Sequence, residues 1–398
     1  MTRSSRPTAL AAVLALALSL PLLGAAPASA AGDAPAAARA VSDPPVTARP
    51  ELPAPAGPHA VGRRTLHLVD RSRTDPWMPA VGHRELMVSV SYPARPSGGA
   101  PATYMTTEEA RLLLEERGLG GVVAAGTVAG TRTHARTAAP PAPGRFPLVL
   151  LSPGFGMPRT TLTSLADDLA SRGYVVAVVD HAYESVGTEF PGGRMLPCVA
   201  CEEVGSGPEY ASVVSGRAAD LSFVIDQLTA RHGPGAALSR MIDARRIGVA
   251  GHSIGGAAAA GTMAADRRVR AGADLDGDFF VQEPGAGLGG RPFLMIGAAA
   301  THSPDSTGTD WSQAWSRLHG WKRWLTFDGA GHFSFTDFPW LGDQLGLPDP
   351  AVPLSGERSW ALTRDYVAAF FDRHLRGIPR PLLDGPTPSR PEVTFHRR

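Results

Sequence analysis

The chain has 398 residues, of which 38 are lysine or arginine and 37 are aspartate or glutamate, so its formal net charge at pH 7 is +1. This balance lacks the basic surplus that a nucleic-acid partner or a polybasic membrane anchor requires. We therefore expect no nucleic-acid partner and at most transient contact with lipid surfaces.

The N-terminal segment has the pattern of a secretory signal peptide. Two arginines in the first six residues precede an apolar run over residues 9–23, and residues 28–30 have the small-residue sequence Ala-Ser-Ala of a cleavage site. We predict a signal peptide over residues 1–30 and a secreted, extracellular protein. Residues 31–60 are rich in alanine and proline and lack hydrophobic periodicity, which predicts a disordered leader.

Residues 61–379 are predicted to form one α/β domain, and residues 380–398 a C-terminal tail. Apolar runs bounded by glycine or proline predict strands, and apolar residues three or four apart predict helices. The predicted strands include 64–69, 85–92, 146–152, 174–180, 269–275, 292–296 and 324–327, and the helices include 106–117, 360–375 and two centred near Leu165 and Val224. Residues 123–143 and 181–208 lack periodicity. The alternation of strand and helix from residue 146 predicts a mostly parallel, doubly wound sheet.

The two cysteines, Cys198 and Cys201, lie in the irregular segment 181–208. In an exported protein, an isolated C-x-x-C pair is typical of a tight local disulfide. A zinc site would need further ligands, and no histidine pair has metal-ligand spacing. A thioredoxin-like redox role would need a βαβ context of its own. We therefore predict a disulfide and no metal site.

The most informative motif is Gly-His-Ser-Ile-Gly at residues 251–255, which follows an apolar run beginning near Arg246. A G-x-S-x-G sequence between a strand and a helix is the nucleophile elbow of an α/β hydrolase. Glycine is needed on both sides because the sharp turn leaves no room for a Cβ. The small residues that follow allow the next helix to pack closely on the sheet. Ser253 is therefore the predicted nucleophile of an α/β-hydrolase fold.

A nucleophilic serine needs a base and an acid, and in this fold the chain order is serine, acid, histidine. His332 follows the last predicted parallel strand in a glycine-rich loop and is the predicted base. Two strand ends offer an acid, Asp276 and Asp305, and either could hold the Nδ1 hydrogen of the histidine. Asp274 is the less exposed choice beside Asp276.

Four segments together carry a resemblance to a known family. They are residues 62–76, residues 84–93, the elbow, and the His-Phe-Ser-Phe-Thr-Asp sequence at residues 332–337. The chain resembles the platelet-activating factor acetylhydrolase family of the plasma type, isoform II, and its bacterial lipase and esterase relatives, over nearly the whole predicted domain. In that family the acid lies in a Leu-Asp pair about two dozen residues after the serine. Asp276 lies in such a pair, so the resemblance favours it over Asp305.

The oxyanion hole is expected to use the amide of Ile254, directly after the nucleophile, and one amide from the loop after strand 146–152. By position and by resemblance this second donor is Phe155. The sequence departs from the family pattern at Pro153, where the family has histidine, and at Asp278, where it has an aromatic residue.

The resemblance implies a serine carboxylic ester hydrolase that forms an acyl-enzyme and acts on small-molecule lipid-like or short-acyl esters. Such a reaction needs no metal and no organic cofactor. The alternatives are a general triacylglycerol lipase or polyester hydrolase, and a catalytically inactive binding protein with a hydrolase fold.

Overall fold

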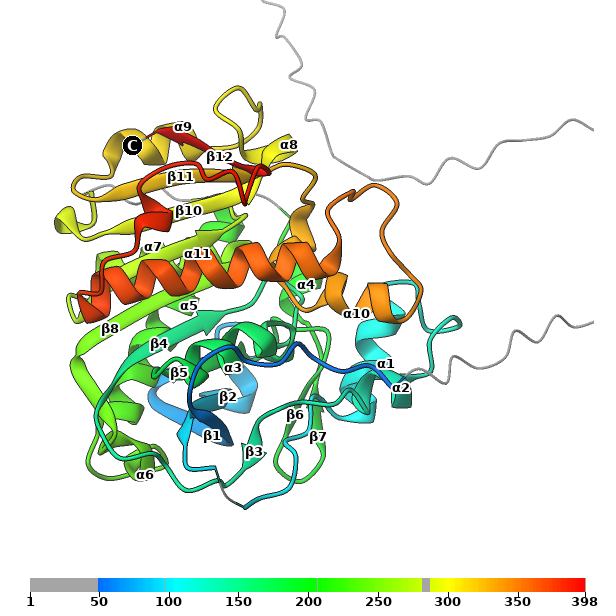
Figure 1. Ribbon diagram of the computed structural model, residues 1–398. Coiled ribbons are helices and arrows are strands. Elements are labelled where there is room, and N and C mark those ends of the chain that lie inside the picture. Colours follow the sequence, from blue (N-terminus) through cyan, green and yellow to red (C-terminus); the bar gives the residue numbers. More distant parts are fainter. Residues whose placement is uncertain (1–48, 97, 206, 281–286, 398) are drawn as a thin grey trace, which may run out of the picture. The chain divides into compact units, whose positions relative to one another are not determined.

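A ten-stranded sheet runs through the structure, a computed structural model that describes residues 49–397 except 97, 206 and 281–286. The strands lie in the order β12-β11-β10-β9-β8-β4-β5-β2-β1-β3 (Figure 1). Their bounds are Ala60–Thr74 (β1), His83–Ala94 (β2), Arg136–Thr137 (β3), Phe146–Ser152 (β4), Val175–His181 (β5), Ile242–His252 (β8), Val269–Leu275 (β9), Phe293–Ala298 (β10), Lys322–Phe327 (β11) and Val393–Arg397 (β12). Two short strands, β6 (Thr188–Phe190) and β7 (Arg194–Leu196), form a separate hairpin.

The middle of the sheet is parallel and antiparallel strands flank it on both sides, while the two-residue edge strand β3 pairs in parallel with β1. Strands β5, β4, β8, β9, β10 and β11 pair in parallel. Strands β1 and β2 add an antiparallel side next to β5, and β12 pairs antiparallel with β11. Every residue of β5 is buried, as expected for a parallel strand with helices over both of its faces. The predicted α/β class with a mostly parallel, doubly wound sheet is confirmed.

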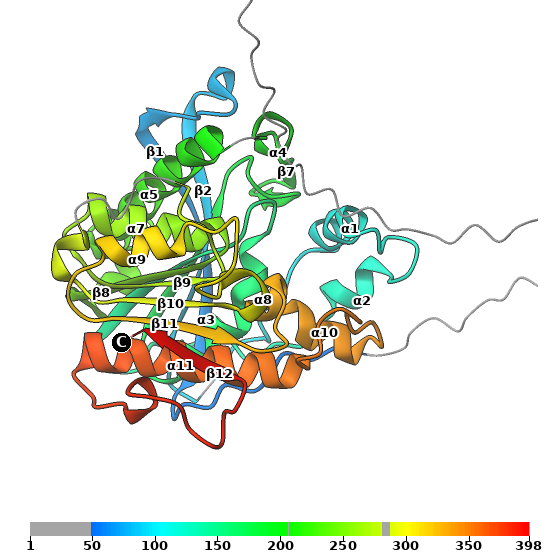
Figure 2. The same cartoon turned by 90° about the horizontal axis from the view of Figure 1, so that it is seen from above.

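Helices cover both faces of the sheet (Figure 2). Helices α3 (Thr163–Ser171) and α11 (Gly356–Arg376) pack on one face. Helices α5 (Gly207–Thr229), α7 (Ile254–Ala265) and α9 (Trp311–Arg317) pack on the other. The core is therefore split into two layers, one on each side of the strands.

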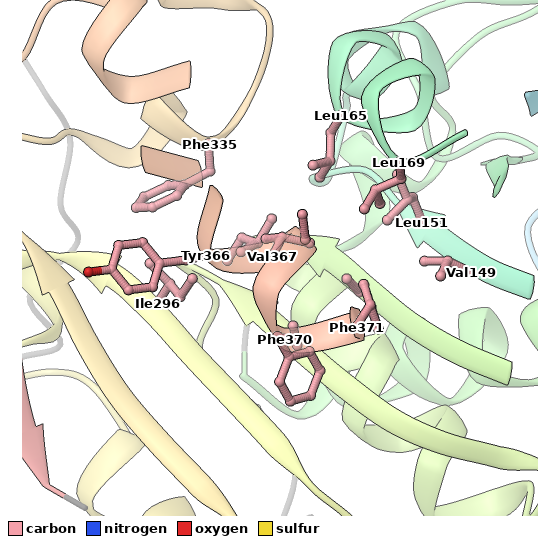
Figure 3. Packing of buried hydrophobic residues seen from close by; sticks show 14 of the residues in the cluster. Val149, Leu151, Leu165, Leu169, Ile296, Phe335, Tyr366, Val367, Phe370 and Phe371 are labelled. Carbon is pink, nitrogen blue, oxygen red and sulfur yellow. The ribbon is translucent and has the colours of Figure 1, made fainter. Parts of the chain in front are cut away.

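Alternate residues of each strand enter the two core layers. Val149 and Leu151 of β4 lie in the layer that also contains Phe371 of α11 (Figure 3), whereas Leu148 and Leu150 belong to the opposite layer. This division follows from the two-residue period of a strand. Each fully buried leucine or phenylalanine contributes about 1.5–3 kcal/mol relative to an exposed one. The two layers thereby fix the strand ends on which the site is built.

The remaining helices lie in the connections between these elements. They are α1 (Thr107–Glu116), α2 (Ala125–Ala129), α4 (Ala200–Glu203), α6 (Ala236–Ser239), α8 (Ala299–His302) and α10 (Phe338–Gln344). Thr106 caps α1: its side chain accepts a hydrogen bond from the Glu109 amide at 3.2 Å, and the Glu109 carboxylate accepts one from the Thr106 amide at 2.9 Å. This capping box begins the helix where the sequence predicted it.

Both ends of the domain differ from the sequence prediction. The predicted signal peptide, residues 1–30, lies outside the described residues, as does the leader up to residue 48. Within the predicted leader, Leu52 is buried and the Gly57 amide donates to Ser171 Oγ at 2.8 Å. Within the predicted tail, β12 extends the sheet. Both segments are short and have no hydrophobic periodicity, so their sequences do not reveal that they pack on the domain. This packing depends on partners far away in the chain.

The two segments without periodicity also contain short elements. Residues 123–143 include α2 and β3, and residues 181–208 include the β6–β7 hairpin and α4. Cys198 and Cys201 form a disulfide, as predicted. A Cβ built on Gly156, in the loop after β4, would lie 3.7 Å from Cys201 Sγ, so the disulfide borders that loop.

Within the described residues, no helix is both long enough and apolar enough to cross a bilayer.

Candidate active site

Ser253 lies at the sharp turn from β8 into α7. Its backbone has φ 56° and ψ −131°, a positive φ that non-glycine residues rarely adopt. A Cβ on Gly251 would lie 2.7 Å from Ser152 O, and a Cβ on Gly255 would lie 2.8 Å from Pro153 O. Both distances are far below normal contact, so the chain needs glycine on each side of the turn. The turn leaves Ser253 partly exposed at the carboxyl end of its strand.

Asp276 and His332 lie at the carboxyl ends of two other strands. Asp276 directly follows β9, and His332 is in the loop after β11. His332 Nδ1 lies within hydrogen-bond distance of Asp276 Oδ2, at 2.7 Å. The Ser253 amide donates to Leu275 O at 2.9 Å, so the strand that precedes Asp276 adjoins the elbow. The Ser253 hydroxyl makes no hydrogen bond to His332 in this structure, which is common for such pairs before substrate binds.

The two other carboxylates considered as the acid have different surroundings. Asp305 is exposed in the loop after α8. Asp274 is fully buried, and its Oδ1 accepts a hydrogen bond from the Gly277 amide at 3.0 Å. Burial raises the pKa of Asp274 well above its usual range, which opposes its ionisation. Of these three carboxylates, Asp276 is the one for which the structure describes a contact with His332.

Asp276 is held from several sides. It is buried, with φ 64°, and the amide of Ala298 donates to its Oδ1 at 2.6 Å. His302 Nδ1 lies 2.8 Å from the same oxygen. Burial opposes ionisation, but His302 and His332 outweigh it and hold the pKa of Asp276 below its usual range. Asp276 is therefore an anion whose two oxygens face two different imidazoles.

His302 is absent from the residues that the sequence analysis selected. It lies at the end of α8, outside any motif, and no spacing rule connects it to the acid. Its contact with Asp276 depends on the packing of a loop 26 residues further along the chain.

His252, the residue before the nucleophile, holds the loop that carries His332. Its Nε2 donates to His332 O at 2.7 Å, and the two ring centroids are 4.6 Å apart. Burial, assisted by the neighbouring His332, lowers the pKa of His252 to about 3, so the ring is neutral. The sequence motif identifies His252 only as part of the elbow, because its partner lies 80 residues away.

The two predicted oxyanion donors lie next to the elbow. Ile254 is the first residue of α7, where an amide hydrogen has no acceptor within its own helix. Phe155 lies in the turn after β4. A Cβ on the preceding Gly154 would lie 2.9 Å from His252 Nδ1, so this turn passes directly beside the elbow.

A second serine, histidine and aspartate chain lies next to the loop that carries Phe155. Ser152 Oγ is 3.0 Å from His181 Nε2, and His181 Nδ1 is 2.8 Å from Asp220 Oδ2. All three side chains are buried, so substrate has no access to this serine. Arg217 donates to Ser152 Oγ at 3.3 Å and to Pro153 O at 2.5 Å. The network therefore fixes the start of the loop rather than forming a second site.

Aromatic side chains border the proposed oxyanion hole. The rings of Phe155 and Tyr210 have centroids 5.7 Å apart, and those of Tyr210 and Phe280 are 4.9 Å apart. All three rings are partly buried and pack in the cluster that contains Ile254, together with Cys198 of the disulfide. We call Phe155, Tyr210 and Phe280 the aromatic wall.

The fold and the site together define an α/β hydrolase. The sheet is mostly parallel, a serine lies at the sharp turn after β8, and a hydrogen-bonded histidine and aspartate lie at later strand ends. A family model described as platelet-activating factor acetylhydrolase, isoform II, matches residues 47–190 and 234–346. The chain belongs to that family, as its sequence resemblance predicted.

Individual relatives agree with this assignment. A protein of Arthroderma benhamiae, described as a probable 1-alkyl-2-acetylglycerophosphocholine esterase, is 30% identical over 378 residues, which is 86% of this chain and 93% of the relative. The platelet-activating factor acetylhydrolase of Cavia porcellus is 24% identical over 267 residues, or 56% of this chain and 58% of the relative. A solved structure of a ferulic acid esterase from Streptomyces cinnamoneus has 49% identity and a TM-score of 0.77, and the match covers 88% of this chain and 100% of that one. The protein is a carboxylic ester hydrolase with a small-molecule ester substrate.

Proposed function

We propose that the protein is a secreted serine esterase in which Ser253 is the nucleophile, His332 the general base and Asp276 the acid. The observation that carries the proposal is the 2.7 Å contact between His332 Nδ1 and Asp276 Oδ2, at the strand end that adjoins the elbow. The ionised state of Asp276 and the partial exposure of Ser253 also support these roles.

The reaction proceeds in two steps. His332 Nε2 takes the proton of Ser253 Oγ while that oxygen attacks the ester carbonyl carbon, and the amides of Phe155 and Ile254 stabilise the resulting oxyanion. The imidazolium then protonates the leaving alcohol, which departs and leaves an acyl-enzyme. Water attacks the acyl-enzyme by the same route and regenerates the serine. Throughout, Asp276 orients the imidazole and stabilises its charged form.

Membership of the acetylhydrolase family supports lipid-like or short-acyl esters as one substrate class. The relative from Arthroderma benhamiae is described by its action on an acetyl ester of a glycerophosphocholine.

The aromatic wall favours a second substrate class, esters of an aromatic acid. Phe155 is the proposed second oxyanion donor, and its ring belongs to the wall, which packs in the cluster that contains Ile254, the residue after the nucleophile. A planar aromatic acyl group stacked there would gain about 0.5–1.5 kcal/mol beyond simple burial. The similarity to a ferulic acid esterase, at 49% identity, agrees with this class.

Export is supported by two features of the chain. Residues 1–30 have the charged, apolar and small-residue regions of a signal peptide. The Cys198–Cys201 disulfide is the form in which a cysteine pair persists in an oxidising compartment.

Steady-state kinetics with matched variants test the function. We expect Ser253→Ala to lower kcat for p-nitrophenyl acetate by orders of magnitude. The control is Ser215→Ala, whose exposed hydroxyl only donates to Ala211 O within α5. Ser253→Ala hydrolysis at the parental rate would contradict the proposal.

A substrate panel separates the classes. The panel contains methyl ferulate, a 2-acetyl glycerophosphocholine, and p-nitrophenyl esters from acetyl to palmitoyl. A higher kcat/KM for methyl ferulate supports the aromatic class, and a higher value for the acetyl phospholipid supports the lipid-like class. A steady rise through palmitoyl with activation at an oil interface would instead support a general lipase.

A further inference from the structure

His302, at the end of α8, lies between two carboxylates at the strand end that carries the acid. Its Nδ1 is 2.8 Å from Asp276 Oδ1, and its Nε2 is 3.7 Å from Asp278 Oδ1, an ion-pair distance rather than a hydrogen bond. Thr301 Oγ1 lies 3.0 Å from the same Nδ1, and the ring packs on Trp311 with centroids 4.4 Å apart. His302 is buried. Each ring nitrogen faces a carboxylate, which favours the imidazolium with a proton on both.

Besides Asp276 and Asp278, two further carboxylates, Asp274 and Asp310, lie near this strand end. Burial raises the pKa of Asp274 and of Asp310, and the Asp310 amide donates to Asp278 Oδ1 at 3.3 Å. His332 contacts the opposite oxygen of Asp276. Burial opposes a charge on His302, but Asp276 and Asp278 outweigh it and raise the pKa of His302 to about 10. At neutral pH the acid thus has a permanent cation on one oxygen and the catalytic imidazole on the other.

We propose that His302 is a positioning residue for Asp276, and that its positive charge extends the activity of His332 as a base to lower pH. If Asp276 had no such cation beside it, His332 would become protonated, and so unable to act as a base, at a higher pH. The inference rests on the proposed triad. It has two parts. First, His302 and the Ala298 amide together occupy Oδ1, which directs Oδ2 toward His332. Second, one carboxylate shared by two cations stabilises the second cation less, so protonation of His332 requires a lower pH.

The pH dependence of kcat/KM tests the second part, because its acidic limb reports the free enzyme's base. In His302→Gln we expect this limb to move up by about one pH unit, because loss of one cation beside Asp276 lets the carboxylate stabilise protonated His332 more strongly, while the exposure of His332 screens part of the effect. Below the limb, kcat/KM then falls about tenfold relative to the parent, and this ratio shrinks as the pH rises. A merely structural role would lower activity equally at all pH values.

The matched control is His374→Gln. The His374 ring also packs on a tryptophan, Trp321, with centroids 4.3 Å apart, but the charged neighbours that act on it are arginines. We expect its acidic limb to coincide with that of the parent.

Asp278→Asn gives a second test with the opposite sign. This variant removes a negative charge while His302 keeps its contact with Asp276, so the limb is expected to move to lower pH. If His302→Gln does not fold, this variant decides the question alone.

An unmoved limb in both folded variants, or an upward shift in Asp278→Asn, would overturn the inference. Ser253→Ala separates this failure from failure of the proposed function. If Ser253→Ala abolishes activity while the limb stays unmoved, the triad stands and the role of His302 is wrong.

Discussion

Gly255 determines how closely Ser253, the proposed nucleophile, approaches the loop that carries Phe155, the proposed oxyanion donor. A Cβ at this position would lie 2.6 Å from Ser152 C and 2.8 Å from Pro153 O, with Ser152 O closer still. Non-bonded carbon atoms prefer separations of about 3.5–4.0 Å, so Gly255→Ala requires a displacement of roughly 1 Å. All three obstructing atoms belong to the backbone, where no side-chain rotation relieves the overlap. The helix that begins after Ser253 must therefore move away from the loop that carries the oxyanion donor.

The expected cost of Gly255→Ala follows from that displacement. Overpacking of a buried site costs about 1–3 kcal/mol, and we expect the upper end because the obstructing atoms are backbone. A displacement of about 1 Å between reacting groups costs about 100-fold in rate. We therefore expect kcat for p-nitrophenyl acetate to fall about 100-fold, with a loss of about 3 kcal/mol in the free energy of unfolding.

Urea unfolding and steady-state kinetics on the same preparation measure both effects. The control is Gly216→Ala within α5, where a Cβ meets no atom within 4 Å. This control should keep the parental kcat and gain up to about 1 kcal/mol from its higher helix propensity. A Gly255→Ala protein whose free energy of unfolding lies within about 0.5 kcal/mol of the parental value, and whose kcat lies within twofold of it, would refute the steric explanation.

Three further predictions concern the acid, the disulfide and the pH dependence of stability. Asp276→Asn should lower kcat about 10⁴-fold, because only the true partner fixes the imidazole tautomer; exposed Asp305→Asn should have little effect, and the reverse order in kinetics would move the acid to the later loop. Replacing Cys198 and Cys201 with serine should lower the free energy of unfolding by about 2 kcal/mol, the chain-entropy value for so short a loop, with little change in kcat; two alkylated thiols in intact-mass analysis of unreduced parent protein would contradict the disulfide. His302 has a folded-state pKa of about 10, above its ordinary value of 6.5, so its stabilisation is complete below pH 6.5 and is lost as the pH rises to 10. Urea unfolding across that range should show a decline of a few kcal/mol in the parent that His302→Gln lacks, and equal declines would show that His302 is not charged.

Local patterns predicted much of the fold and the central residues of the site. The elbow around Ser253 is a local motif whose glycines are required by backbone contacts within one turn. The strand ends at Asp276 and after β11 follow from short apolar runs bounded by polar residues. Because carboxyl ends of parallel strands meet at one edge, these patterns placed His332 near two candidate acids, Asp276 and Asp305, and the family resemblance then favoured Asp276.

The residues that sequence reasoning missed act through long-range contacts. His302 reaches Asp276 from a different loop, and His252 reaches His332 across 80 positions. Neither contact leaves a periodic pattern or a spacing signature. The same holds for β12, since a five-residue edge strand gains its stability from β11 rather than from its own sequence. Only packing in three dimensions determines these features.

Labelling with a fluorophosphonate, followed by peptide mass spectrometry, tests most directly the claim that His332 activates Ser253. The account predicts one adduct per chain, on Ser253, formed in the parent and slowed by orders of magnitude in His332→Ala. An adduct on another residue, no adduct on the active protein, or equally fast labelling of His332→Ala would contradict it.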